Sequence, residues 1–382
     1  MSTTSKLSFD VIVLGGGTMG SGAALALARR GQRVLVLEQF TTPSTLASHS
    51  GRTRIIRQAY FESPAYVPMV RDADRMWVAI GEEIGRTLLH RCGGLDISAP
   101  GETQAESARR SAAQWDVPHE SLDGNEVNRR WPQFHLPDDW AACYSPVTGF
   151  LDVDPGLTAM RSLAERSGAV WHEHEPALIW EATASGVRVK TAAGTYSADR
   201  LVISAGAWAA TALAGLGLPL TVRRKLLWWY EMDDRAAYVA DRFPVLIAGM
   251  PGCQLYVIPI SGDDPGLKAG DHAGGEETVA GELRREIDDR EAESVTAAMR
   301  TLVYGLGAIR DRQVCMYTMT PDEDFIVDRH PEHANVTFAA GFSGHGFKFA
   351  PAMGEHLADL SSDPMAQPLA HIGLARLAQA VG

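Results

Sequence analysis

The sequence contains few cysteines, and their spacing excludes two classes of cysteine-dependent protein. The 382 residues include four cysteines, namely Cys92, Cys143, Cys253 and Cys315. They are widely spaced and form no C-x-x-C pair, which argues against a structural zinc site and against a disulfide scaffold. We therefore expect reduced thiols and no bound metal.

The sequence also lacks a long apolar run and an excess of positive charge. The first ten residues are polar, and the apolar run at residues 11–14 is too short for a signal peptide or a membrane span. The net charge of −12 disfavours nucleic acid and anionic membrane surfaces as partners. We expect a cytoplasmic protein. A hydrophobic content of 45% in 382 residues is enough for two domains, each with its own core.

What the sequence does contain is a nucleotide-binding pattern at its start. An apolar strand is followed by Gly15, Gly17 and Gly20 at G-x-G-x-x-G spacing, then by a helix over residues 18–30. A second strand ends at Glu38, whose carboxylate would bind the adenosine ribose and repel a 2′-phosphate. The alternative is a plain glycine turn. With the strand before it and the acid after it, the pattern indicates FAD or NAD rather than NADP.

Two later segments are predicted to return to the same domain. One ends in an apolar strand at residues 201–204, followed by small residues up to Gly206. The other is a strand, a glycine-rich loop and a helix beginning near Pro351, whose N-terminal amides would stabilise negative charge on a flavin ring. A flavin is suggested by Cys315, a single thiol beside the aromatic and acidic run MYTMTPDEDFIVD.

These motifs together resemble the monomeric sarcosine oxidase and N-methyltryptophan oxidase family over nearly the whole chain. The resemblance rests on five blocks in the expected order: GGGTMGSGAALALARRG, GRTRIIRQAY, GLKAGDHAGG, CMYTMTPDEDFIVD and GFSGHGFKFAP. It implies an α/β fold, mixed with α+β features, with a Rossmann-like FAD-binding domain of the glutathione reductase and D-amino acid oxidase type. We place that domain at residues 1–85, 150–218 and 325–382. A mixed-sheet catalytic domain would then take residues 86–149 and 219–324.

The same resemblance implies roles for residues around the flavin. Cys315 would carry FAD through a thioether, and a cationic setting would lower the pKa of its thiol. Lys268 matches the lysine that promotes reaction with dioxygen, because a fixed ammonium favours the superoxide anion. Gly344, His345 and Gly346 match the flavin-side loop. Without the motifs, these residues would be read as a buried thiol, a surface lysine and a structural histidine.

The substrate side is implied in the same way. Arg54 lies at the flavin, while Arg57 and Lys348 would bind the substrate carboxylate, a task that suits a planar guanidinium and a compact ammonium. The remaining residues that match the substrate site are His272, Tyr256, Ile247 and Tyr317. Arg52 has no assigned role, and Asp324 stands where relatives often carry histidine. Without the resemblance, the arginines could equally be a solvated basic run.

The sequence therefore predicts an FAD-dependent oxidase of a secondary amino acid. The substrate would be sarcosine, another N-methyl amino acid or a cyclic amino acid, oxidised to an imine that hydrolyses, with dioxygen reduced to hydrogen peroxide. We expect a monomer with no nucleic-acid or membrane partner. The alternatives are a related flavin dehydrogenase that uses another electron acceptor, or a non-catalytic flavin-binding sensor.

Overall fold

A computed structural model describes residues 9–379 of the chain. Predictions that concern residues 1–8 and 380–382, including the absence of a signal peptide and the end of the FAD-binding domain, lie outside the described residues. The chain divides into two compact units. Unit 1 is Met1–His49, Asp154–Val222 and Met316–Gly382, and unit 2 is Ser50–Val153 and Arg223–Cys315.

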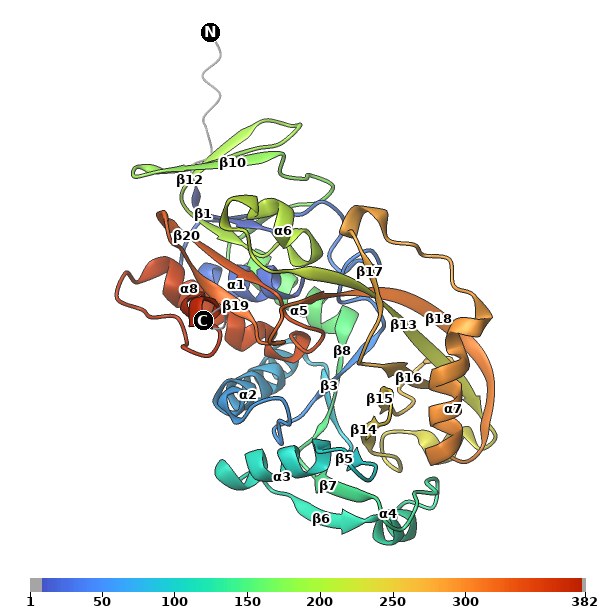
Figure 1. The fold of residues 1–382 in the computed structure, drawn as a ribbon. Coiled ribbons are helices and arrows are strands. Elements are labelled where there is room, and N and C mark those ends of the chain that lie inside the picture. Colours follow the sequence, from blue (N-terminus) through green and yellow to red (C-terminus); the bar gives the residue numbers. More distant parts are fainter. Residues whose placement is uncertain (1–8, 380–382) are drawn as a thin grey trace. The chain divides into compact units, whose positions relative to one another are not determined.

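Unit 1 is an α/β unit built on a largely parallel sheet (Figure 1). Its elements are β1 (Phe9–Leu14), α1 (Thr18–Arg29), β2 (Val34–Leu37), α5 (Val153–Arg166, whose first residue belongs to unit 2), β9 (Val170–His172), β10 (Ile179–Thr183), β11 (Gly186–Lys190), β12 (Thr195–Ile203), α6 (Ala209–Ala212), β19 (Ile326–His330), β20 (His333–Ala340), α8 (Ala350–Ser362) and α9 (Ala375–Gln379). The strands β20, β12, β1, β2 and β9 pair in parallel in that order, and the strands β10, β11 and β19 add antiparallel pairs.

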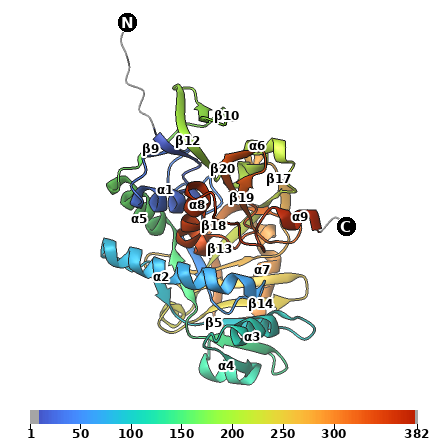
Figure 2. The ribbon, with the colours of Figure 1, turned by 90° about the vertical axis from the view of Figure 1, so that its left-hand side faces the viewer.

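The parallel strands of unit 1 are short apolar runs because helices cover the sheet. Helices α1 and α8 lie side by side against it (Figure 2). Their axes approach closely at two glycines: a Cβ added to Gly22 would lie 2.2 Å from the carbonyl oxygen of Ala350, and one added to Gly354 would lie 2.2 Å from the carbonyl carbon of Gly22. The segments that the sequence predicted to return to one domain therefore pack together in unit 1, with the predicted helix at Pro351 present as α8.

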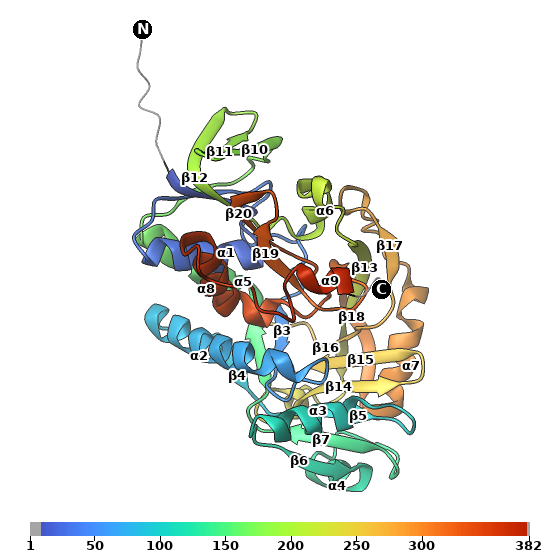
Figure 3. The same cartoon turned by 60° about the vertical axis from the view of Figure 1, so that its left-hand side comes forward.

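Unit 2 is built on a large mixed sheet. Its elements are β3 (Thr53–Ile56), α2 (Val67–Ile84), β4 (Leu89–Arg91), β5 (Gly94–Ser98), α3 (Gln104–Gln114), β6 (Glu120–Asp123), α4 (Gly124–Arg130), β7 (Ala141–Ser145), β8 (Gly149–Asp152), β13 (Thr221–Met232), β14 (Val245–Met250), β15 (Cys253–Ile258), β16 (Leu267–Asp271), β17 (Glu276–Thr278), α7 (Glu293–Leu302) and β18 (Leu306–Met319). Two of the four boundaries between the units fall within β13 and β18. The strand order is β17-β13-β16-β15-β14-β5-β7-β6, and its β14, β15, β5 and β7 strands are seen in Figure 3.

The two faces of this sheet differ because side chains alternate along each strand. One face carries the main hydrophobic core of unit 2, which includes Leu246, Leu255, Trp228 and Met299 of α7. The opposite face carries the next residue along each strand, such as Ile247, Tyr256 and Trp229. The register of the sheet therefore separates the core from the residues that the sequence predicted to be functional.

The boundaries of the two units differ from those expected from the sequence. Residues 50–85 lie in unit 2, because β3 and β4 both pair with β8 in a small separate sheet. The assignment of FAD binding to one domain and substrate binding to the other stays a prediction.

Candidate active site

The glycine turn after β1 is shaped by close backbone packing in unit 1. Gly15 has a φ of +91°, and a Cβ on Gly20 would lie 1.7 Å from the carbonyl oxygen of Gly15. No side chain fits at Gly20. A Cβ on Gly17 would come no nearer than 3.8 Å to a neighbour, and Gly17 is the N-cap of α1 without a side-chain cap bond. This open helix N-terminus fits the pyrophosphate of a dinucleotide.

Glu38 directly follows β2 and is held against the glycine turn. Its Oε2 accepts a hydrogen bond of 2.7 Å from the backbone N–H of Gly16, and its Oε1 accepts one of 2.8 Å from Phe40. Burial raises the pKa of Glu38, although these backbone bonds act in the opposite direction. The carboxylate thus holds the glycine turn through hydrogen bonds from the backbone. Its role toward the adenosine ribose stays a prediction.

A second cluster in unit 1 brings together residues from the CMYTMTP and GFSGHGFKF segments. Gly344 has a φ of +82°, and a Cβ there would lie 2.3 Å from the ring of Tyr317. The Nζ of Lys348 donates a hydrogen bond of 2.6 Å to the carbonyl of His345, whose Nε2 lies 3.1 Å from the carbonyl of Glu323. The buried ammonium of Lys348 is thus fixed next to the glycine-rich loop that the sequence predicted to be functional.

A Cβ on Gly346 would lie 2.7 Å from Phe342, so this loop also leaves no room for a larger residue at its second glycine. Asp324, for which no role was predicted, has a backbone carbonyl that accepts hydrogen bonds of 2.7 Å from Thr320 and 2.8 Å from Arg376.

In unit 2, Lys268 is a buried cation on β16. Its side chain is 1% exposed, and its Nζ donates hydrogen bonds of 2.6 Å to the carbonyls of Gly51 and Thr53. Burial, followed by the nearby charge of Arg54, brings the pKa of Lys268 well below its usual value. The ring of Trp229 lies 5.6 Å from the ammonium.

Cys315 shares this environment. Burial raises the pKa of its thiol, whereas the charges of Arg54, Lys268 and Lys225 act to lower it. The cationic setting expected from the sequence is present, but the net direction is opposite to the expected one because desolvation of a thiolate outweighs these charges. Arg54 itself donates hydrogen bonds of 2.5 Å and 2.9 Å to the carbonyls of Ser50 and Thr53.

Arg57 forms a buried ion pair that the sequence did not predict. Its Nη2 contacts both carboxylate oxygens of Glu62, at 2.5 Å for Oε1 and closer for Oε2. The guanidinium also lies over the rings of Tyr60 and Phe61, at 4.3 Å and 4.0 Å from their centroids. The only local signal for this pair is an acid five residues after the arginine.

Arg52, for which no role was predicted, lies near the same Trp229 ring as Lys268. It has a φ of +64° and forms ion pairs with Asp264 at 3.9 Å and Asp311 at 3.5 Å. Its guanidinium lies 5.8 Å from the ring of Trp229. These contacts give Arg52 a structural part in the loop before β3.

The remaining predicted substrate residues belong to the face of the unit 2 sheet opposite its hydrophobic core, called the functional face below. Ile247 of β14 is the register partner of Tyr256 of β15, and Tyr256 is the partner of Gly270 of β16. A Cβ at Gly270 would lie 2.4 Å from the hydroxyl of Tyr256, so the glycine leaves room for this ring. His272 follows β16, and its backbone N–H donates a 2.8 Å hydrogen bond to Gln254.

Sequence reasoning missed three polar residues on this face. Asp96 of β5 is the register partner of Ile247 and is 3% exposed. Gln104 and Gln254 form a hydrogen bond of 2.9 Å next to it. No motif marks these residues, since they come together only through strand register and the placement of α3.

The comparisons with known proteins agree with this architecture. A family profile described as FAD dependent oxidoreductase matches residues 10–360. The chain is 38% identical to "Monomeric sarcosine oxidase" of Streptomyces avermitilis over 98% of this chain and 99% of that one. It is 35% identical to "N-methyl-L-tryptophan oxidase" of Yersinia pestis over 94% of this chain and 96% of that one.

Solved structures show the same fold at lower identity. NikD, described as an unusual amino acid oxidase, superimposes with a TM-score of 0.84 at 24% identity, covering 96% of this chain and 97% of that one. L-proline dehydrogenase from P. horikoshii superimposes with a TM-score of 0.82 at 23% identity, covering 98% and 99%.

The chain belongs to the family of FAD-dependent oxidoreductases. Within it, the full-length similarity confirms the predicted resemblance to the sarcosine oxidase and N-methyltryptophan oxidase group. The predicted α/β FAD-binding fold, the FAD cofactor and the assignment to flavoprotein oxidoreductases are confirmed as well. No helix within residues 9–379 is long and apolar enough to cross a membrane.

Proposed function

We propose that this protein is an FAD-dependent oxidase of a secondary amino acid, such as sarcosine, another N-methyl amino acid or a cyclic amino acid. The observation that carries the proposal is the 38% identity to a monomeric sarcosine oxidase over 98% of the chain. The buried cations of unit 2 support it, because a desolvated ammonium such as Lys268 is costly unless it acts on a negative charge.

The protein's own residues have distinct parts in the proposed reaction. Arg57 and Lys348 each bind a carboxylate oxygen of the substrate, and Ile247, Tyr256, Tyr317 and His272 shape the space for its amine. The redox chemistry would be supplied by bound FAD, as acceptor of a hydride from the carbon next to nitrogen and as donor of electrons to dioxygen. Lys268 stabilises the anion formed from dioxygen, held in place by the carbonyls of Gly51 and Thr53.

We further propose that Cys315 carries FAD through a thioether bond. Its thiol is buried, and although burial raises the pKa of the thiol, the charges of Arg54, Lys268 and Lys225 act in the direction that a thiolate needs. The resemblance of their motifs assigns Arg54 and His345 to the flavin surroundings as well. Dioxygen as electron acceptor, a cytoplasmic location and a monomeric state complete the proposal.

The experiment is an anaerobic titration of the purified flavoprotein with sarcosine, N-methyl-L-alanine, L-proline and L-pipecolate, followed by admission of air. Loss of the oxidised flavin spectrum with one of these amines, and its return with one equivalent of hydrogen peroxide, is the expected result. Bleaching without peroxide under air would instead identify a dehydrogenase with another acceptor. If no secondary amino acid bleaches the flavin, the proposed function is wrong.

A further inference from the structure

The functional face of the unit 2 sheet contains a buried carboxylate, Asp96, beside the proposed substrate site. Ile247 is the register partner of Asp96 on one side and of Tyr256 on the other. Residues paired in register point to the same face of a sheet. Asp96, Ile247 and Tyr256 therefore form one row across three strands, on the face opposite the hydrophobic core.

Asp96 is the acceptor end of a short hydrogen-bond chain. The Nε2 of Gln254 donates to the Oε1 of Gln104 at 2.9 Å, and the Nε2 of Gln104 donates to the carbonyl of Ile247 at 2.9 Å and to the Oδ1 of Asp96 at 3.4 Å. The last bond is long for a charged acceptor. Within residues 9–379, no second hydrogen bond to this carboxylate is present.

The charges around Asp96 leave its carboxylate without a full partner. The cation whose charge acts on Asp96 is Arg57, and its Nη2 is already engaged by both oxygens of Glu62. Burial raises the pKa of Asp96 to about 7, against the effect of Arg57. Glu62 and Asp96 already place two carboxylates near Arg57, and a substrate carboxylate would be the third acid near this one guanidinium. A hydrogen-bond donor or a cation from the ligand would relieve this imbalance.

We propose that Asp96 is a specificity-determining residue that accepts a hydrogen bond from the substrate's side chain. The enzyme would then prefer secondary amino acids whose side chain ends in a donor, and most of all a cationic donor such as an ammonium group. The inference rests on the proposed function, because that function places the substrate beside Ile247 and Tyr256. Gln104 and Gln254 are positioning residues that orient the carboxylate.

The first test uses substrates that differ only in a methyl or an ammonium group at the end of the side chain. N-methyl-L-ornithine is compared with N-methyl-L-norleucine, and N-methyl-L-2,4-diaminobutyrate with N-methyl-L-norvaline, by kcat/KM of the wild-type flavoprotein. We expect the cationic member of at least one pair to be favoured by about tenfold or more. Equal values in both pairs, or a preference for the apolar members, would overturn the inference.

A binding measurement removes the chemical step. The ligand 5-aminopentanoate differs from hexanoate only by an ammonium group in place of the terminal methyl, and 4-aminobutanoate differs from pentanoate in the same way. None of these ligands carries an amine next to its carboxylate. Calorimetric titration should give tighter binding to the amino acid of at least one pair, by about tenfold. Tighter binding of both alkanoates would contradict the role of Asp96.

Variants then assign the preference to one carboxylate. Asp96→Asn should reduce the preference for the cationic substrate by about tenfold, since it removes the charge and keeps the shape. Glu282→Gln, the same change of charge at an exposed position, should keep it. A preference unchanged in Asp96→Asn would show that another group recognises the cation. If Asp96→Asn does not fold, the wild-type substrate and ligand pairs still decide the question.

These outcomes separate the inference from the proposed function. Oxidation of N-methyl-L-norleucine and sarcosine without any preference for a cationic side chain would refute the inference and leave the function standing. Failure of every secondary amino acid to bleach the flavin would refute both.

Discussion

Arg57 and Glu62 form an ion pair in which one guanidinium nitrogen contacts both oxygens of the carboxylate. Both side chains are largely buried, with exposures of 3% and 14%. If Arg57 binds the substrate carboxylate, Glu62 competes with the substrate for the same nitrogen. The binding of substrate then includes the cost of displacing an internal carboxylate.

This competition predicts that Glu62→Gln lowers KM for a secondary amino acid by about tenfold. The variant should also be less stable than wild type, because the free protein then contains a buried guanidinium with a weaker partner. Glu82→Gln on α2, which is exposed, is the control. Steady-state kinetics and denaturant unfolding measure the two effects, and a KM equal to that of wild type would show that Glu62 does not compete.

The position of Lys268 predicts a separation of the two half-reactions. Lys268→Met should leave flavin reduction by the amine largely unchanged and should slow reoxidation by two to three orders of magnitude, as expected from the loss of about 3 to 4 kcal/mol of charge stabilisation. Stopped-flow absorbance measures each half-reaction. Reoxidation at the wild-type rate would remove Lys268 from the oxygen chemistry.

The lowered pKa of Lys268 predicts how reoxidation depends on pH. Burial and the charge of Arg54 disfavour the ammonium form, so the lysine loses its proton well below its usual pKa of 10.5. The reoxidation rate should therefore be high below the lowered pKa and should fall as pH rises through it. Lys268→Arg, whose guanidinium keeps its proton, should give a flat profile. A flat profile for wild type up to pH 10.5 would contradict this assignment.

Cys315 is expected to hold FAD covalently. Acid-precipitated wild-type protein should retain the yellow colour and give a fluorescent band on a denaturing gel, while Cys315→Ala should release all of its flavin into the supernatant. Cys253→Ala is the matched control, because Cys253 is a second free cysteine of unit 2 outside the predicted motif. Free FAD in the supernatant of the wild-type protein would refute the bond.

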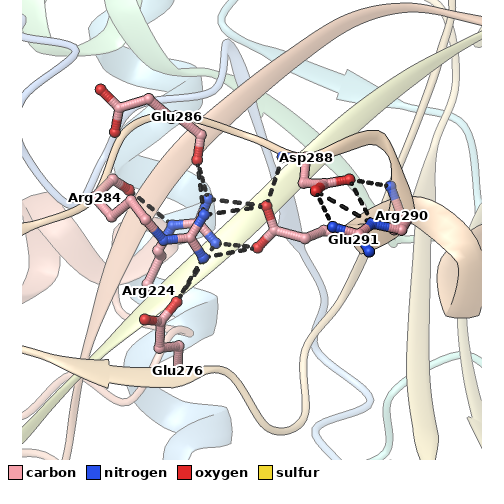
Figure 4. A network of polar contacts seen from close by, with 7 residues as sticks. All are labelled: Arg224, Glu276, Arg284, Glu286, Asp288, Arg290 and Glu291. Carbon is pink, nitrogen blue, oxygen red and sulfur yellow. Dashed lines mark hydrogen bonds and ion pairs between the residues drawn. The ribbon is translucent and has the colours of Figure 1, made fainter.

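A polar network on β13 predicts how stability depends on pH (Figure 4). Arg224 is 4% exposed and contacts Glu291 at 2.5 Å and the carbonyls of Arg284 and Glu286 at 2.8 Å and 2.7 Å. Burial acts to raise the pKa of Glu291, but the hydrogen bonds from Arg224 and Arg284 outweigh it and lower that pKa to about 2.

The pKa of Glu291 is lower in the folded protein than in the unfolded chain. The stabilisation that this carboxylate gives the folded protein is therefore complete above the unfolded value of 4.5 and is lost as pH falls toward about 2. Between about pH 5 and about pH 3, the free energy of unfolding should decrease less in Glu291→Gln than in wild type. Arg224→Met should cost about 2 to 3 kcal/mol, since it removes the buried cation and leaves the Glu291 carboxylate with the more exposed Arg284 as its remaining cationic partner. Equal pH dependence in wild type and Glu291→Gln would contradict this account.

The sequence predicted those parts of the molecule that depend on local patterns. Gly15 and Gly17 lie in the turn before α1 and Gly20 lies in the first turn of that helix, where it packs on Gly15. The helix predicted at residues 18–30 is present as α1, and the strand at residues 201–204 corresponds to the end of β12. Motif resemblance then identified the family, because five blocks in order carry more information than any one of them.

Other features depend on contacts that no local pattern encodes. Gln104 and Gln254 are 150 residues apart, and Asp96 joins them only because β5 and β14 pair in one register. The direction of the thiol pKa of Cys315 was missed for a different reason. Sequence identifies the cations, but only the packing of the side chain shows that desolvation exceeds their effect.

Successive side chains of β14 point to opposite faces of the sheet, so that Leu246 lies in the hydrophobic core and Ile247 lies in the candidate site. Inserting or deleting a single residue in this strand would exchange these two directions, so the chain would lose its core and its substrate-facing surface in the same step. Natural variation in substrate choice should therefore arise at this strand by replacement of side chains at fixed length, with changes of length restricted to the loops that flank it.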